Sequence, residues 1–155
     1  MAKTNARLAN SNDKNDLETF IGYNLKRAYI IIKDDFNKSL GPNGLAPREF
    51  SLLSLVVTFP HITQSELARM LGIERSGLVS IVDKLEGANY LQRVVMPSDR
   101  RAQALVASDV GKQAYADMLV IVTEHEERLL TDLSADERTE LIRLLQKIRR
   151  KDKNQ

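Results

Sequence analysis

The sequence predicts a mainly α-helical protein with one small β-hairpin. Apolar residues recur at helical spacing through most of its 155 residues. Two short runs, over 91–95 and 102–107, carry strand signals instead and flank a polar turn. From 63 to 107 the order is a short capped helix, a glycine turn, a second helix and the hairpin. That order is typical of a winged helix-turn-helix, here with further helices before and after it.

The N-terminal part of the chain predicts two helices. The first is expected over about 16–40, where apolar side chains recur at helical spacing, and the Gly-Pro-Asn-Gly run at 41–44 ends it. Pro47 suits the first turn of the next helix, where its missing N–H leaves no bond unmade. Phe59 and Pro60 end that second helix.

The two helices of the helix-turn-helix are delimited by their end residues. Thr63 and Glu66 form a capping box, and Gly72 stands where a left-handed residue closes a helix. The next helix is expected over about 74–87, and Asn89 tolerates the positive φ that would end it. Its inner face carries Leu78, Ile81, Val82 and Leu85, and its outer side carries Arg75, Ser76, Ser80, Asp83 and Lys84.

Two more helices follow the hairpin. Ser108 caps a long helix over about 109–131, and Ser134 with Glu137 opens a final helix through a second capping box. We expect one domain over 1–155. Its parts are a flexible arm at 1–15, dimerisation helices at 16–45 and 109–151, and a winged helix-turn-helix lobe at 47–107.

Composition limits the class of protein. The chain carries 23 lysines and arginines against 21 aspartates and glutamates, so any positive charge that meets DNA must be local. Cysteine is absent, which excludes disulfides, thiolate zinc sites and a thiol redox switch within this chain. No window approaches the run of about 18 apolar residues that crosses a membrane, and the first residues lack the apolar core of a signal peptide. We therefore expect a cytoplasmic protein with no membrane partner.

The outer face of the 74–87 helix has the character of a DNA-reading surface. A helix enters the major groove when its exposed side chains are small or flexible, and Ser76, Gly77 and Ser80 meet that need. Arg75 or Lys84 could contact base edges or phosphates. The start of the preceding helix could hold phosphate through Gln64 and Ser65. Such residues alone fit a solvated face equally well, and the order of elements is what favours DNA.

The hairpin tip carries a second candidate contact. An arginine there, Arg100 or Arg101, can enter the narrow minor groove. Asp99 is placed to orient one of them through a charge-assisted pair, and Arg93 adds positive charge near the strands. The alternative for this tip is a polar turn with an exposed ion pair.

Together these residues resemble the MarR family of bacterial transcription regulators, over about 17–150. The most specific stretches are Gln64–Ala68, Leu71–Ile73, Leu78–Ser80, Asp83–Glu86 and Pro97–Ala102. The resemblance implies a homodimer built on the first and last helices, in which each lobe meets half of a pseudo-palindrome. It also implies a repressor that a small ligand releases. It gives Ser76, Gly77, Ser80 and Lys84 the major-groove role and Arg100 or Arg101, braced by Asp99, the wing role. Glu74 departs from the family pattern, where aspartate or serine commonly caps this helix.

The first two helices supply candidate effector contacts. The resemblance implies that they line a ligand site together with the helix at 109–131. We therefore expect an anionic aromatic effector, an aromatic acid or its acyl-CoA thioester. The candidate contacts are Tyr23, Arg27, Tyr29, Ile30, Arg48 and Phe50. The alternative is that the aromatic residues belong to the dimer core and the cations are solvated.

An enzyme is not expected, because the chain has no cysteine nucleophile, glycine-rich phosphate loop, HExxH or GxSxG motif. No cofactor and no metal are expected either. His125 stands among glutamates, which predicts an exposed acidic helix face rather than a metal site. Two other functions stay open. One is an effector-independent DNA-binding activator or architectural protein, and the other is a winged-helix module that binds only protein.

Overall fold

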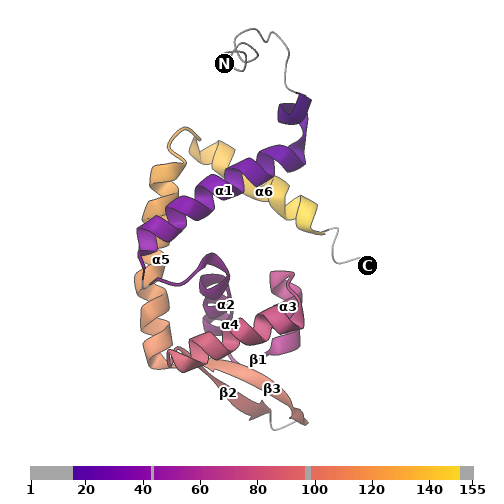
Figure 1. Cartoon of the computed structure of the whole chain (residues 1–155), viewed down its shortest axis with the longest axis vertical. Helices are drawn as coiled ribbons and strands as arrows, with labels where there is room; N and C mark the ends of the chain where they lie inside the picture. The colour runs from indigo at the N-terminus through magenta and orange to yellow at the C-terminus, as the bar shows by residue number, and fades with distance from the viewer. Residues whose placement is uncertain (1–15, 43, 97–98, 151–155) are drawn as a thin grey trace, which may run out of the picture.

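The computed structural model describes residues 16–42, 44–96 and 99–150, with the backbone alone at 99–102. The arm expected at 1–15 lies outside these residues. In chain order the elements are η1 (Asp16–Thr19), α1 (Ile21–Leu40), α2 (Pro47–Thr58), β1 (Ile62–Thr63), α3 (Gln64–Leu71), α4 (Arg75–Gly87), β2 (Leu91–Met96), β3 (Asp99–Ala107), α5 (Asp109–Leu129) and α6 (Ala135–Arg149). Figure 1 shows α2, α3, α4 and the strands gathered in one lobe, from which α5 leads toward α1 and α6. The mainly α-helical class with a small β-wing is confirmed.

Local sequence decides where the helices of the lobe begin and end. The Thr63 hydroxyl accepts the N–H of Glu66, and the Glu66 carboxylate accepts the N–H of Thr63 at 2.9 Å. Gly72 closes α3 with a φ of 63°, and Asn89 follows α4 with a φ of 58°. Both left-handed residues were predicted. Glu74 precedes α4 and makes no side-chain cap, so the start of this helix lacks one hydrogen bond.

The three strands form an antiparallel sheet in the order β1-β3-β2. Ile62 of β1 pairs with Leu105, and Leu91 of β2 pairs with Ala107. The sequence did not predict β1, because two residues are too short to show an alternating pattern. The extra strand ties the segment before α3 to the hairpin and so fixes the helix-turn-helix against the wing.

The lobe is built around one buried core, drawn from α2, α3, α4 and the strands. From α4 this core takes Leu78, Val82 and Leu85, three of the four residues predicted for the inner face. Fully buried side chains of the core include Leu52, Leu53, Val56, Leu67, Leu78, Val82, Leu85 and Leu105. Burial of this face directs the opposite face of α4 outward.

Helices α1, α5 and α6 carry large apolar side chains that stay exposed in the single chain. Many exposed large apolar side chains on a few helices are typical of a protein–protein interface. Examples are Phe20, Ile21, Tyr29, Ile31, Val120, Ile142 and Ile148. Among the helices described, none is long and apolar enough to cross a membrane.

The junction between the hairpin and α5 is closely packed. The N–H of Ser108 donates to the carbonyl of Tyr90 at 3.0 Å, and the Ser108 hydroxyl accepts the N–H of Gly111 at 2.9 Å. Gly111 lies so close to the same carbonyl that a Cβ there would stand 1.9 Å from the oxygen. Glycine at this position therefore sets how closely α5 approaches the lobe.

Candidate nucleic-acid interface

The outer face of α4 is exposed and carries the small side chains expected of a groove-reading helix. Ser76, Gly77 and Ser80 are all exposed, and so is Arg75, the first residue of the helix. The structure brings these four predicted residues together on one element. Arg75 has no ion pair within the described part of the chain. Its guanidinium is thus available to an anion.

The two residues predicted for phosphate contact at the start of α3 lie in its first turn. Ser65 is exposed and Gln64 is half-buried. The capping box of Thr63 satisfies the N–H of Glu66 and leaves the earlier amide groups of the turn without a helical partner. An anion beside this turn would meet those N–H groups and the positive end of the helix dipole.

Lys84 is exposed, but its ammonium group is paired inside the lobe. It donates to Glu49 at 2.7 Å, and Glu49, which is nearly buried, also accepts the N–H of Ala46 at the start of α2. The pair therefore joins α4 to α2 across 35 positions of sequence. A contact of Lys84 with DNA stays a prediction, and it would require this ammonium group to turn away from Glu49.

Arg93 on β2 is bound to two carboxylates of α4. Its guanidinium donates to Asp83 at 2.5 Å and also to Glu86, which in addition accepts the backbone N–H of Arg93 at 3.2 Å. The side chain of Arg93 is only 22% exposed. The hydrogen bond to Asp83, followed by the charge of Glu86, raises the pKa of Arg93, so the group is a permanent cation. The sequence placed Arg93 among DNA contacts without anticipating these partners.

The wing tip has an irregular register. Val95 pairs with Gln103 and the next residue, Met96, pairs with Asp99, so β3 has three extra residues between these partners. The extra residues are 100–102, and a bulge of this kind bends a strand and redirects its side chains. Arg100 and Arg101 therefore belong to the irregular part of β3. Their side chains and that of Asp99 lie outside what the structure describes, so the predicted pairing of Asp99 stays a prediction.

A row of rings joins α1, α2 and α5 next to the lobe. Phe50 contacts Phe36 edge-on with ring centroids 6.0 Å apart, and it contacts Tyr115 at 5.6 Å. Phe36 in turn meets the ring of His125 at 5.9 Å. The hydroxyl of Ser54 lies 3.2 Å from that of Tyr115. The α1 residue in this row is Phe36, which is not one of the predicted effector contacts.

The prediction that His125 lies on an exposed face is wrong, because its side chain is only 1% exposed. Its Nδ1 lies 2.6 Å from the Asp35 carboxylate, which also accepts from Arg128 at 2.7 Å. Its glutamate neighbours are exposed as expected, but position 125 faces α1. The Nε2 atom is buried and has no hydrogen-bond partner among the described residues. Among those residues, no cluster of three or more histidines and carboxylates could hold a metal ion.

We expect Asp35→Asn to lower stability at neutral pH and to change its pH dependence. Hydrogen bonds from His125 and then from Arg128 hold the pKa of Asp35 below its ordinary 3.8. The charged carboxylate therefore stabilises the fold above that ordinary value, and this contribution is lost as pH falls through the lowered pKa. Urea unfolding midpoints should differ between wild type and variant at pH 7, and the difference should shrink as the pH falls below about 4.

The exposed neighbour Asp34 provides the control for that experiment, since it has no ion pair in the described part of the chain. Asp34→Asn should leave the midpoint nearly unchanged at both pH values. A constant difference between wild type and Asp35→Asn across the whole pH range would contradict the role assigned to the Asp35 carboxylate.

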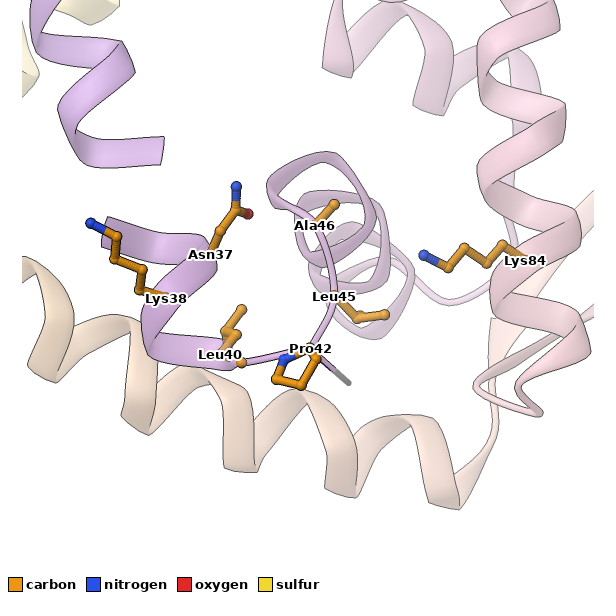
Figure 2. A pocket seen from close by; sticks show the side chains of 9 residues that line it. Asn37, Lys38, Leu40, Pro42, Leu45, Ala46 and Lys84 are labelled. Carbon is orange, nitrogen blue, oxygen red and sulfur yellow. The ribbon is translucent and has the colours of Figure 1, made fainter. Parts of the chain in front are cut away.

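A pocket of about 540 Å³ lies between the last turn of α1, the α1–α2 connection and Lys84 of α4. Figure 2 shows Lys84 extending from α4 toward the start of α2, with Asn37 and Lys38 coming from the last turn of α1. The floor is formed by the α1–α2 connection, including Pro42 and Leu45. This volume is within the range of about 300–1,000 Å³ found for small-molecule sites.

The effector contacts predicted from the sequence are spread along two helices and do not line this pocket. Tyr23, Arg27, Tyr29 and Ile30 lie in the N-terminal half of α1, and Arg48 and Phe50 lie in the first turn of α2. Tyr29 and Ile30 are exposed, as are Arg27 and Arg48, while Tyr23 and Phe50 are half-buried. Within one chain the rings gather instead at the other end of α1, around Phe36.

Sequence comparison agrees with this architecture. The family model described as MarR family matches residues 43–102, which hold α2, the helix-turn-helix and most of the hairpin. A protein of Thauera aromatica, described as a putative transcriptional regulatory protein for the hcr operon, is 30% identical over 133 residues, which is 85% of this chain and 80% of that protein. The chain belongs to the MarR family. Its family and fold are therefore those of DNA-binding transcription regulators and not of enzymes.

Solved MarR-family structures extend the likeness beyond residues 43–102. The transcriptional repressor CouR bound to a 23-mer DNA duplex is 36% identical, with a TM-score of 0.83, and the match covers 90% of this chain and 99% of that one. CouR bound to p-coumaroyl-CoA is 34% identical with a TM-score of 0.79 over the same shares of both chains. The same repressor is therefore known bound to a DNA duplex and bound to an acyl-CoA thioester.

Proposed function

We propose that this chain is a homodimeric repressor that an aromatic acid, or its acyl-CoA thioester, releases from a pseudo-palindromic operator. The observation that carries the proposal is the likeness, over 90% of this chain, to a repressor that binds both a DNA duplex and p-coumaroyl-CoA. The exposed, small-residue face of α4 supports the DNA part. The pocket beside Lys84 supports the ligand part, since it adjoins the helix that would read DNA.

The dimer in this proposal uses the helices outside the lobe, over 16–45 and 109–151. Their exposed apolar side chains need a partner surface, and members of this family are dimers. Two lobes related by a two-fold axis would place their α4 helices about 34 Å apart, one turn of the duplex. Each half of the operator would then meet one lobe, formed by 47–107.

In the DNA complex we assign α4 to the major groove and the hairpin to the minor groove. Ser76, Gly77 and Ser80 would approach base edges, with Arg75 beside them. Phosphate contacts would come from Gln64 and Ser65 at the start of α3, and Arg100 or Arg101 would enter the minor groove. Changes at Ser76 or Ser80 should therefore alter the preferred operator sequence.

For the effector we propose a division between an anionic end and an aromatic end. Lys38 brings a positive charge to the pocket, and Lys84 would bring a second one if its ammonium group turned from Glu49 to the ligand, which suits the anionic end. The aromatic end would meet the ring-bearing faces of α1 and α2. The contacts proposed there remain Tyr23, Arg27, Tyr29, Ile30, Arg48 and Phe50.

The deciding experiment is a fluorescence-anisotropy titration on duplex DNA from upstream of the protein's own gene. We expect sequence-selective, salt-sensitive binding that one member of a panel of benzoates, hydroxycinnamates and their CoA thioesters abolishes. Binding that no compound alters would support an effector-independent activator or architectural protein instead. No selective binding at low salt would leave only the protein-interaction function.

The chain offers a matched pair of variants for the ligand part. Lys38→Ala should raise the concentration of effector needed for release while leaving DNA affinity intact, because Lys38 lines the pocket but lies on α1. Lys26→Ala removes the same charge from an exposed position of α1 outside the pocket and should change neither quantity. Equal responses of both variants and wild type would remove Lys38 from the effector site.

A further inference from the structure

The side of α4 that would face DNA carries a negative charge. Asp83 follows Ser76 and Ser80 by seven and three residues, so the three side chains share one face of the helix. The Asp83 side chain is 60% exposed. A second carboxylate, Glu86, stands one turn from Asp83 and is 37% exposed. Two carboxylates near a groove lined by phosphates would repel the DNA.

Arg93 is the residue that counters both charges. Its guanidinium donates to Asp83 with one terminal nitrogen and to Glu86 with the other. Arg93 lies on β2, and its backbone N–H also donates to Glu86, which holds this part of the strand beside α4. These contacts occupy both ends of the guanidinium and leave its side chain largely buried. The arrangement suits neutralisation of the helix better than a contact with phosphate.

We propose that Arg93 is a positioning residue for operator binding, which offsets the paired negative charge of Asp83 and Glu86 and so lets α4 approach DNA without itself binding the DNA. This inference rests on the proposed DNA-binding function. This role differs from a direct contact, in which the arginine itself would attract the DNA. Here Arg93 only reduces the repulsion from Asp83 and Glu86, so it matters only while the two carboxylates are present. Removing the carboxylates should make the arginine dispensable.

The test is a charge-rescue series measured by anisotropy at low salt. The probes are the duplex from upstream of the protein's own gene and a mixed-sequence duplex, since the repulsion does not depend on sequence. Arg93→Ala should weaken binding about ten-fold to both probes. The triple variant Arg93→Ala, Asp83→Asn, Glu86→Gln should return to within about three-fold of wild type. A merely structural salt bridge would not be restored by these changes, because the triple variant still lacks it.

Two further variants keep the series decisive. Arg93→Lys retains the positive charge beside both carboxylates and should keep most of the affinity. Arg143→Ala is the matched control, since Arg143 pairs with Glu140 on α6, away from the lobe, and it should leave affinity unchanged. Thermal unfolding of each variant shows whether affinity follows charge or loss of fold.

The contrary outcomes are distinct. A triple variant as weak as Arg93→Ala would show that Arg93 acts either by contacting DNA directly or through the salt bridge itself, and not by offsetting the charge of the carboxylates. Full affinity of Arg93→Ala would show that the carboxylates do not matter. Either result overturns the inference while wild-type binding stands. Failure of wild type to bind either duplex would overturn the proposed function and this inference with it.

Discussion

Replacement of Gly111 with alanine is expected to lower the free energy of unfolding by about 3 kcal/mol. The new Cβ would stand 1.9 Å from the Tyr90 carbonyl oxygen and 2.7 Å from its carbon, both of them backbone atoms. The same carbonyl accepts the N–H of Ser108, so it cannot move away without breaking the hydrogen bond that precedes α5. Relief of the clash must therefore displace α5 from the hairpin.

Urea unfolding of wild type and variant at one protein concentration measures this loss, since the stability of a dimer depends on concentration. Gly87→Ala is the control, because a Cβ at that exposed helical position meets no atom within 4 Å. It should leave stability unchanged or raise it by at most about 1 kcal/mol. Equal stability of Gly111→Ala and Gly87→Ala would show that α5 does not pack against Tyr90 as described.

The double variant Arg100→Ala, Arg101→Ala is expected to weaken DNA binding about 100-fold, because each such contact contributes about 1–3 kcal/mol. Both residues follow the tip of the hairpin, where β3 departs from its pairing with β2. The loss should be similar for operator and mixed-sequence duplexes if these contacts are to phosphate and groove. The slope of log affinity against log salt should fall by about 2.

The C-terminal turn of α6 supplies the control for that measurement. Lys147→Ala with Arg149→Ala removes the same two charges from the last turn of α6. Cations there interact favourably with the end of the helix dipole, and we expect affinity to change by less than about two-fold. An equal loss from both double variants would show that net charge alone, and not the wing, determines binding.

Features fixed by neighbouring residues were predictable from the sequence. The capping boxes at Thr63 and Ser134 and the left-handed residues Gly72 and Asn89 depend on a few consecutive positions, and the structure confirms them. The inner face of α4 was equally predictable, because the burial of its residues follows from their helical spacing. The order of these local features was sufficient to predict the winged helix-turn-helix.

Features fixed by distant contacts were not predictable. His125 is buried because Asp35 and Phe36, some 90 positions earlier, pack against it, and its own neighbours are exposed glutamates. Pairing of Lys84 with Glu49 likewise depends on how α4 crosses α2. The sequence identified Lys84 and Arg93 as candidate DNA contacts, but only the fold shows which carboxylates already pair with them.

The position of Lys84 has a consequence for how ligand and operator influence each other. This lysine lines the pocket and also belongs to α4, so an anion that takes it from Glu49 would act on the helix that we propose to read DNA. Coupling free energy between two ligands is reciprocal. If the effector weakens operator binding by some factor, operator DNA must weaken effector binding by the same factor. A repressor molecule bound to its operator would then need an effector concentration higher, by that same factor, than the free protein needs for half-saturation.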